Sequence, residues 1–170
     1  MKNISFRNDV LPLKNVLYRL AFRITLNSAE AEDIVQDTLI KVWNKRDEWS
    51  EIGSMEAFCL TVCRNLSLDR IKKMDNQNDS LDDTNIERTD TASNPYEDAT
   101  HKDRIELVQR LVNGLPEKQR SCMQLRDFEG KPYKEIAEIL GITEEQVKVN
   151  IFRARQAVKE KFQKLDNYGL

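Results

Sequence analysis

The sequence Tyr133-Lys134-Glu135-Ile136-Ala137-Glu138-Ile139-Leu140 is followed directly by Gly141-Ile142-Thr143 and then by residues 144–164, which contain no glycine or proline. Apolar residues recur at three- and four-residue spacing in both parts, which predicts two helices. Gly141 permits a tight turn between them, and Thr143 with Gln146 predicts a capping box at the start of the second helix. This order and spacing are typical of a helix-turn-helix, with an ordinary helical hairpin as the alternative.

The outer face of the second predicted helix has the chemistry needed to contact bases. Arg153 can bond guanine bidentately, which is worth about 1–3 kcal/mol of discrimination, and apolar groups can touch a thymine methyl. Phe152 lies on a basic outer face, where it has no core to fill. We therefore expect Lys148, Val149, Phe152 and Arg153 to face the major groove, while the later lysines contact phosphates or only keep the helix soluble.

The 170 residues carry 27 Lys+Arg and 29 Asp+Glu, but these charges are unevenly spread. Residues 1–74 have a net charge of +2, residues 75–103 of −7 and residues 104–165 of +4. The middle segment is mostly Asp, Asn, Thr, Ser and Gln, so it cannot bury enough apolar surface to offset the entropy of ordering. We expect residues 75–103 to be an acidic, flexible linker between two small domains, 1–74 and 104–170.

Both predicted domains are helical, so the fold class is all-α. In the first, apolar stripes predict a helix ending near Leu26, a second that opens with a capping box of Asn27 and Glu30, and a third after Gly53-Ser54. We expect Trp43 to lie in the apolar stripe of the second helix, and Phe58, Val62, Leu66 and Ile71 to lie inward on the third. In the second domain, a helix ends at Asn113-Gly114 and Pro116 occupies the first position of the next helix.

Composition excludes much chemistry. No apolar run approaches the ~20 residues needed to span a bilayer, and the first residues carry no secretory signal, so we expect a cytoplasmic protein without direct membrane insertion. Cys59 and Cys63 are a candidate zinc pair, but no second pair completes four ligands, and core thiols are the favoured interpretation. With a single histidine and no phosphate-binding glycine loop, we expect no enzyme, catalytic residue, metal or cofactor.

Two sets of motifs resemble one family. Residues 31–43, Ala-Glu-Asp-Ile-Val-Gln-Asp-Thr-Leu-Ile-Lys-Val-Trp, and residues 58–69 are similar to region 2 of bacterial RNA polymerase sigma factors. The stretches 115–120, 125–130, 135–137, 147–148 and 152–155 resemble region 4. Nothing long enough for regions 1 or 3 is present, which is similar to the extracytoplasmic-function (ECF) class.

This resemblance implies partners and roles for particular residues. It implies that Asp33, Gln36 and Asp37 bind the clamp helices of the largest subunit of core RNA polymerase, with a further contact to the polymerase flap. The −10 promoter element would be melted by the loop 46–56 and the third helix, including Asn65. Its backbone would be held by Arg64, Arg70, Lys72 and Lys73. The −35 element would be contacted by Lys148, Val149, Phe152 and Arg153. The resemblance also implies regulation by an anti-sigma factor.

Simpler interpretations stay open. The face of Asp33, Gln36 and Asp37 could be ordinary solvated helix surface, Asn65 could serve as a turn or cap residue, and Trp43 and Trp49 could be core or loop anchors rather than base stackers. Two other protein classes also remain, a DNA-binding regulator with a helical sensor domain and a protein–protein adaptor. The sensor would need a pocket or dimer face in residues 1–74, and the adaptor would not need the basic residues at 146–164.

Overall fold

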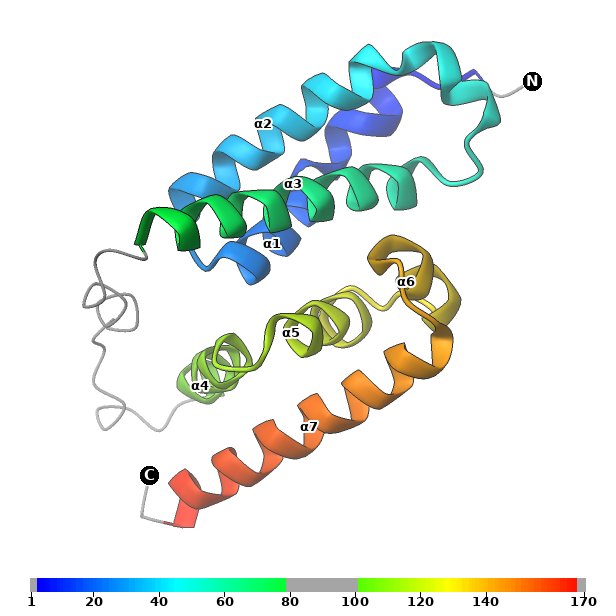
Figure 1. The fold of residues 1–170 in the computed structure, drawn as a ribbon. Helices are drawn as coiled ribbons and strands as arrows, with labels where there is room; N and C mark the ends of the chain where they lie inside the picture. The colour runs from blue at the N-terminus through cyan, green and yellow to red at the C-terminus, as the bar shows by residue number, and fades with distance from the viewer. Residues whose placement is uncertain (1–2, 79–100, 168–170) are drawn as a thin grey trace.

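The computed structural model describes residues 3–78 and 101–167, and every regular element within these ranges is a helix. The first half contains η1 (Phe6–Val10), η2 (Leu11–Leu13), α1 (Lys14–Thr25), α2 (Ser28–Asn44), η3 (Arg46–Glu51) and α3 (Met55–Asn78). The second half contains α4 (His101–Asn113), α5 (Glu117–Met123), η5 (Gln124–Phe128), α6 (Tyr133–Leu140) and α7 (Glu144–Asn167) (Figure 1). The all-α prediction is confirmed.

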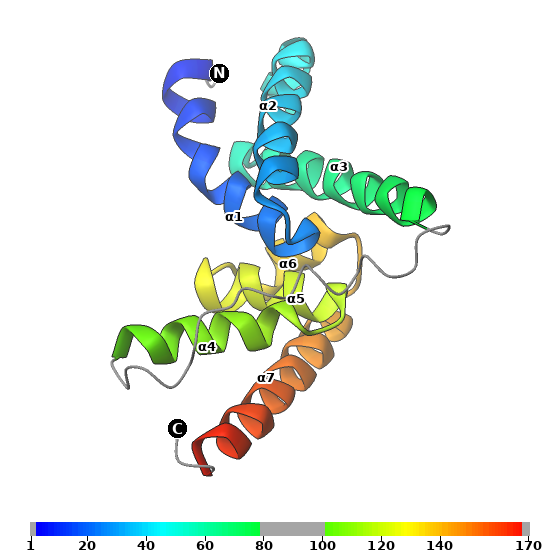
Figure 2. The same cartoon turned by 90° about the vertical axis from the view of Figure 1, so that its left-hand side faces the viewer.

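Each half has its own helix packing. In the first, α1, α2 and α3 pack against one another around fully buried side chains such as Leu17, Ile34 and Leu60. In the second, α4 and α5 pack along α7 over a smaller apolar cluster that includes Val112 and Val158. The described residues form three α-helices in the first half and four in the second, and Figure 2 shows α1–α3 and α4–α7 as two separate groups.

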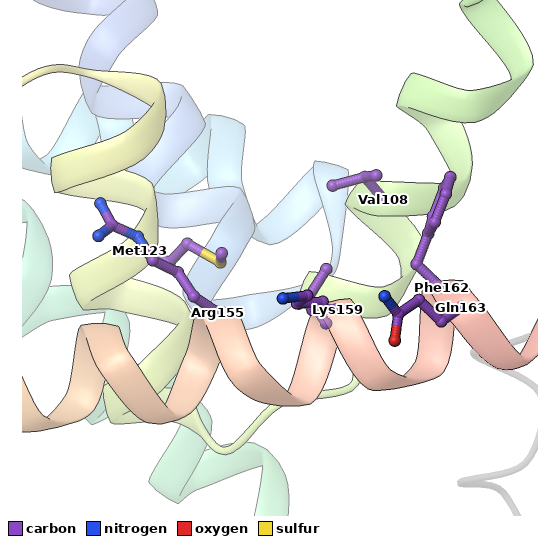
Figure 3. A pocket seen from close by; sticks show the side chains of 7 residues that line it. Val108, Met123, Arg155, Lys159, Phe162 and Gln163 are labelled. Atoms are coloured by element: carbon purple, nitrogen blue, oxygen red, sulfur yellow. The ribbon is translucent and has the colours of Figure 1, made fainter.

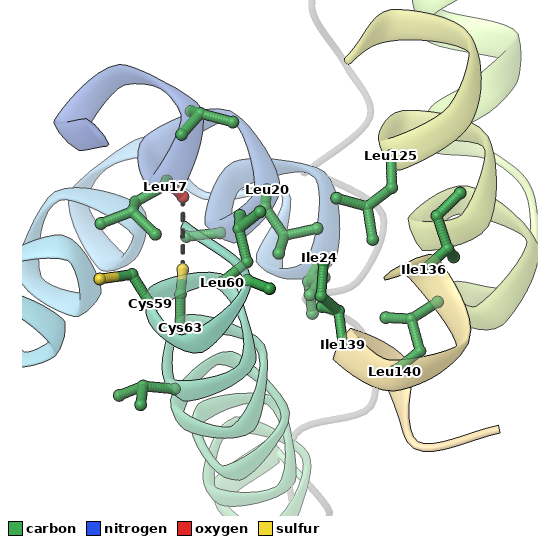
Figure 4. Close-up of a cluster of buried hydrophobic side chains, with 14 of the residues drawn as sticks. Leu17, Leu20, Ile24, Cys59, Leu60, Cys63, Leu125, Ile136, Ile139 and Leu140 are labelled. Carbon is green, nitrogen blue, oxygen red and sulfur yellow. Dashed lines mark hydrogen bonds between the residues drawn. The ribbon is translucent and has the colours of Figure 1, made fainter. Parts of the chain in front are cut away.

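The two halves also pack against each other. A single apolar cluster runs from Ile24 of α1 and Leu60 of α3 to Leu125 of η5 and Ile139 of α6 (Figure 4). Helices α5 and α6 lie against α1 and α3 in both views of the fold (Figures 1 and 2). The sequence predicts two tethered domains but not this shared core, because the contacts join residues about a hundred positions apart.

The helix-turn-helix forms as the sequence predicts. Gly141 adopts the left-handed conformation with φ of 67°, and the amide of Ile142 returns to the carbonyl of Ala137 at 3.1 Å, which closes the end of α6. The capping box is reciprocal, because Thr143 Oγ1 accepts from the amide of Gln146 at 3.1 Å and Gln146 Oε1 accepts from the amide of Thr143 at 2.9 Å. The turn and the start of α7 are therefore fixed locally.

The predicted capping box at the start of α2 forms only in part. The side chain of Asn27 accepts from the amide of Glu30 at 3.0 Å, as a capping residue should. The carboxylate of Glu30 does not complete the box but bonds the guanidinium of Arg70 on α3. Only half of the predicted capping box forms, since a full positive charge is a stronger partner for a carboxylate than a backbone amide.

Several predicted positions differ in the structure. Helix α3 continues through Asn78 and α4 begins at His101, so both ends of the predicted linker are helical, and its remaining residues 79–100 lie outside the described residues. Pro116 is the capping residue before α5 rather than its first residue. Trp43 is 44% exposed rather than part of the core. The inward face of α3 is also rotated from the predicted one: Val62 is buried as predicted, but Cys59, Leu60 and Cys63 are buried in place of Phe58, Leu66 and Ile71, which are half-buried.

Candidate functional site

An acidic surface lies along α2. Asp33, Gln36 and Asp37 project from one face because residues three and four apart on a helix are neighbours. Asp33 and Gln36 are exposed and Asp37 is half-buried, so all three reach solvent. None contributes to the apolar core, which α2 reaches instead through residues such as Ile34 and Val42. This face, together with Glu30, is called the α2 acidic surface below.

Arg70 organises the α2 acidic surface. Its guanidinium pairs with Glu30, with Asp33 Oδ2 at 2.8 Å and with Asp37 Oδ2 at 3.3 Å. Hydrogen bonds to Glu30 and then Asp33 raise the pKa of Arg70 further above its ordinary value. Three carboxylates and one guanidinium leave the surface with a formal excess of two negative charges. The structure thus places Arg70 with the predicted polymerase-binding residues rather than with the other predicted −10 residues.

An apolar patch continues the α2 acidic surface toward the end of the helix. Ile40 is 59% exposed and Trp43 is 44% exposed, and they line a shallow groove with Phe6 and Leu39. The guanidinium of Arg46 lies 4.5 Å above the Trp43 ring, whereas Trp49 is buried and donates from Nε1 to the carbonyl of Val42 at 3.1 Å. This patch was not predicted from the sequence, although Ile40 lies outside the buried stripe of α2 and so indicated an exposed apolar side chain.

The predicted −10 residues of α3 other than Arg70 differ in exposure. Asn65, Lys72 and Lys73 are exposed. Arg64 is half-buried, and its Nη1 donates to the side chain of Asn65 at 3.3 Å. The Nε of Arg64 is buried and has no hydrogen-bond partner among the described residues. Arg64 also reaches the second half, because its Nη1 lies 4.0 Å from the point where a Cβ on Gly141 would stand.

Helix α7 presents the predicted base-contacting residues to solvent. Phe152 is 63% exposed and Val149 is 44% exposed, while their neighbours Val147 and Ile151 are buried against α6. Lys148 and Arg153 are exposed, and the ammonium of Lys148 lies 5.8 Å from the Tyr133 ring centre. The structure therefore brings all four predicted residues onto one accessible face.

Arg155 belongs to a different face of α7. Its guanidinium forms a two-point pair with Asp127, at 3.1 Å and 2.5 Å, which ties α7 to η5. It also lines an apolar groove between α4 and α7, where Val108, Met123 and Phe162 form the lining (Figure 3). Lys159 adds a second positive charge beside these apolar side chains. This α4–α7 groove was not foreseen from the sequence.

The cysteines are core residues. Cys59, Cys63 and Cys122 are free and buried, and burial raises the pKa of each thiol to about 12. Cys63 Sγ donates instead to the carbonyl of Leu17 at 3.3 Å (Figure 4). Because the thiolate is the form that ligates zinc, these environments disfavour a metal role. In residues 3–78 and 101–167, no group of three or more His, Cys, Asp or Glu side chains is arranged for a metal.

Comparison with known proteins matches the two halves separately. The sigma-70 region 2 family model matches residues 10–77, and the sigma-70 region 4 model matches residues 105–158. The ECF RNA polymerase sigma factor SigL of Mycobacterium tuberculosis is 30% identical over 151 residues, which cover 88% of this chain and 84% of SigL. This chain belongs to the ECF sigma factors. No helix in the described parts of this ECF sigma factor has the length and apolar character needed to cross a membrane.

Other relatives agree with this assignment. SigE of Mycolicibacterium smegmatis is 28% identical over 145 residues, which cover 85% of this ECF sigma factor but only 56% of SigE. Among solved structures, the sigma factor RpoE of Bartonella quintana, in complex with the anti-sigma factor NepR, aligns with a TM-score of 0.77 and 27% identity. That alignment covers 95% of this chain and 98% of the other. The resemblance noted in the sequence is therefore confirmed at the level of the family and the fold.

Proposed function

We infer that the chain is an alternative sigma factor, which binds core RNA polymerase and directs initiation at promoters with particular −10 and −35 elements. One observation carries this inference beyond family membership. The α2 acidic surface and the exposed face of α7 are both accessible, have opposite charge and lie on separate halves of the chain. A chain with two such surfaces is suited to joining a protein partner to DNA.

The α2 acidic surface is the proposed site for the clamp helices of the polymerase. A straight row of polar and acidic side chains on one helix fits a second helix that carries basic residues. The neighbouring patch of Ile40 and Trp43 would add apolar area at the centre of the contact, where interfaces gain most of their free energy. Arg70 would hold the carboxylates in position, because its three bonds fix their side-chain conformations.

The part of α3 that carries Arg64, Asn65, Lys72 and Lys73 is proposed to act on the −10 element. Extruding a base costs a few kcal/mol of lost stacking, so a protein that opens the duplex must offer new partners to the unstacked base. The amide of Asn65 offers a donor and an acceptor, and Arg64, Lys72 and Lys73 offer positive charge to the backbone. Arg70 is not included in this group because its guanidinium is paired with carboxylates of α2.

The exposed face of α7 is proposed to contact the −35 element in the major groove. Phe152 and Val149 offer apolar contact to thymine methyl groups, and Arg153 offers a bidentate contact to guanine. The Oε1 of Gln146 accepts from the amide of Thr143, so it already caps the turn. The fixed turn would set the angle at which α7 enters the groove.

Further partners complete the proposal. The α4–α7 groove, with its apolar lining and basic side chains, is proposed to receive the polymerase flap. The solved sigma factor RpoE is in complex with the anti-sigma factor NepR, and CnrH, which shares the fold, is in complex with the cytosolic domain of CnrY. We propose that this chain is also held by an anti-sigma factor. The chain would act in the cytoplasm, beside the polymerase, without an activity or cofactor of its own.

Run-off transcription with purified core RNA polymerase tests the proposal. The double variant Asp33→Arg/Gln36→Arg should lose core binding by about tenfold or more, because it places two positive charges where the proposed contact has one negative and one neutral side chain. Arg153→Ala should keep core binding but lower initiation at −35-dependent promoters by about 5- to 150-fold, the equivalent of one base contact.

Two controls make the result specific. Glu160→Arg reverses a charge at an exposed position of α7, outside the α2 acidic surface, and should leave core binding unchanged. Arg155→Ala removes an arginine two residues from Arg153 that is paired to Asp127, and should leave base discrimination unchanged. If the wild-type chain bound duplex DNA specifically by itself and neither bound core nor directed initiation, the regulator interpretation would replace this one.

A further inference from the structure

The exposed face of α7 carries two apolar side chains on one helical turn. Val149 is 44% exposed and Phe152 is 63% exposed, the highest exposed fraction among the large apolar side chains of the described residues. Residues three apart on a helix are neighbours, so these two side chains form one apolar spot. Their neighbours Val147 and Ile151 are buried, so the core is filled by other residues of the same turns. Val149 and Phe152, called the α7 apolar spot below, are therefore open to a ligand.

The carboxamides beside the α7 apolar spot are already partly occupied. Recognition of adenine by Asn or Gln uses both ends of one carboxamide, which accepts from N6 and donates to N7. Residues 144–155 contain two carboxamides, Gln146 and Asn150. The Oε1 of Gln146 accepts from the amide of Thr143 at 2.9 Å, and the Nδ2 of Asn150 donates to the carbonyl of Gln146 at 2.8 Å. Either side chain would have to break or share this bond to pair with adenine at two points, so these bonds disfavour direct recognition of adenine.

The charged residues beside the α7 apolar spot are poorly suited to identify an A·T pair. Lysine and arginine side chains carry only donors, whereas adenine and thymine each offer a single acceptor in the major groove. Arg153 is exposed and suits the paired acceptors O6 and N7 of guanine. The ammonium of Lys148 lies 5.8 Å from the centre of the Tyr133 ring, an attraction that draws it toward the start of α6. The feature of an A·T pair that best fits this face is therefore the 5-methyl group of thymine.

A methyl group is recognised by apolar contact, which has no preferred direction and depends on the area removed from water. Thymine and 5-methylcytosine carry the same methyl group at C5, whereas uracil and cytosine carry hydrogen there. The side chains of Val149 and Phe152 have no polar atom, so neither can bond the O4 of thymine or the 4-amino group of 5-methylcytosine. The α7 apolar spot is therefore suited to detect the methyl group but not to distinguish the two methylated pyrimidines.

We propose that the α7 apolar spot reads the 5-methyl group of a pyrimidine in the −35 element, so that 5-methylcytosine can replace thymine there and uracil cannot. This inference rests on the proposed function and names the chemical group by which α7 selects its DNA. Methylation of a cytosine at this position would then strengthen binding of the holoenzyme without any change in the base sequence.

A selection with the unmodified chain supplies the DNA probe. Holoenzyme assembled from core RNA polymerase and the full chain selects promoter fragments from a pool of duplexes that is randomised over the −35 and −10 regions. The fragment with the greatest enrichment is then resynthesised as the probe. We expect its −35 element to contain at least one thymine that the holoenzyme requires. An enriched −35 element made only of G·C pairs overturns the proposal.

Modified bases in this probe separate the methyl group from the rest of the base pair. Each −35 thymine is replaced in turn by deoxyuridine, which removes only the methyl group. At one or two positions this change should weaken holoenzyme binding by about fourfold, the equivalent of one buried methyl group. At the same position, 5-methylcytosine paired with guanine should bind about fourfold more tightly than cytosine paired with guanine. Placing 7-deazaadenine opposite the thymine removes the N7 acceptor and should change binding by less than about twofold.

Protein variants test whether the methyl effect acts through α7. At the sensitive position, Val149→Ala or Phe152→Ala should lower the ratio of affinities for thymine and uracil from about fourfold to about one, since alanine keeps the helix but removes the contact. The conservative variants Val149→Ile and Phe152→Leu should keep this ratio above about two. Glu160→Ala, at an exposed position on the same helix, is the matched control and should keep the full ratio. An effect of uracil on DNA shape alone would be the same in every variant.

The outcomes separate this inference from the function on which it rests. If uracil binds as well as thymine at every −35 position while the wild-type holoenzyme still selects a promoter, methyl reading is wrong and the sigma function stands. The same conclusion follows if both alanine variants keep the full ratio, or if 7-deazaadenine weakens binding where uracil does not. If the wild-type holoenzyme selects no promoter, the proposed function fails and methyl reading fails with it.

Discussion

Helices α2 and α7 begin with the same pattern of residues and use it differently. At α7, Thr143 and Gln146 bond each other's amides, so the cap is complete and local. At α2, Asn27 caps the helix, but Glu30 pairs with Arg70 of α3. The second residue of the box therefore stabilises the helix end in one case and builds a charged surface between two helices in the other. The complete cap fixes the start of α7, whose outer face is exposed. At α2, the bond from Arg70 to Glu30 instead links the helix to α3.

The largest expected effect separates the two sides of α7. Ile151→Ala should lower the free energy of unfolding by about 2–5 kcal/mol, because the side chain is 2% exposed and its loss leaves a cavity. The adjacent Phe152→Ala should change stability by less than about 0.5 kcal/mol and lower promoter binding by the holoenzyme. Urea unfolding followed by circular dichroism measures the first, and promoter binding measures the second. Equal stability loss for both variants would mean that Phe152 is structural.

The next effect compares the two helix starts. Thr143→Ala should lower the free energy of unfolding by about 1 kcal/mol, because it removes the acceptor for the amide of Gln146. Asn27→Ala should have a similar effect on α2. Replacing the second residue should distinguish them, since Gln146→Ala also loses a cap bond whereas Glu30→Ala loses only a bond to Arg70. Hydrogen exchange at the first turn of each helix shows which amides lose protection.

A smaller effect concerns Arg70. Arg70→Ala should lower the free energy of unfolding by about 0.5–1 kcal/mol, since the pairs are partly exposed. It should change affinity for core polymerase, because the α2 acidic surface gains net negative charge and loses fixed geometry. Lys72→Ala is the matched control, an exposed cation on the same helix. If Arg70→Ala instead left core affinity intact and weakened only −10 binding, the role implied by the sequence resemblance would be supported.

The smallest effect is a dependence on pH at Glu129. Burial raises the pKa of Glu129, but hydrogen bonds from Arg19 and Gln124, with the charge of Arg19, lower it overall below its ordinary value of 4.5. A lowered pKa stabilises the folded chain above pH 4.5, and this contribution is lost as the pH falls through the folded-state pKa. The melting temperature of wild type should exceed that of Glu129→Gln at pH 7 and approach it in acid. A constant difference across this range would contradict the assignment.

Local features of the fold were predictable from the sequence. The turn at Gly141, the cap at Thr143 and the outward position of Phe152 each depend on residues within one or two helical turns. The acidic row on α2 follows from helical spacing alone. Such features are encoded by neighbours, so periodicity and capping chemistry suffice to place them.

Contacts between distant residues were not predictable. The bonds of Arg70 to the carboxylate of Asp33 and of Arg120 to the backbone carbonyl of Arg23 join residues 37 and 97 positions apart. A sequence identifies a charged residue but not which opposite charge it meets, and several arginines were available in each half. Trp43 was misplaced for a related reason, since Trp49 and Phe6 fill the space at the end of α2 and leave Trp43 at the surface. Which basic residues of α3 are free to contact DNA therefore depends on ion pairs that are seen only in the folded structure.

The bonds from Arg120 also have a consequence for synthesis. The last carbonyls of α1 receive their partners from a residue made long after α1 leaves the ribosome. The first half must therefore fold with the end of α1 hydrated and with Ile24 lacking its apolar neighbours in the second half. Until the second half emerges, the growing chain exposes the side of α1 and α3 that the finished chain covers.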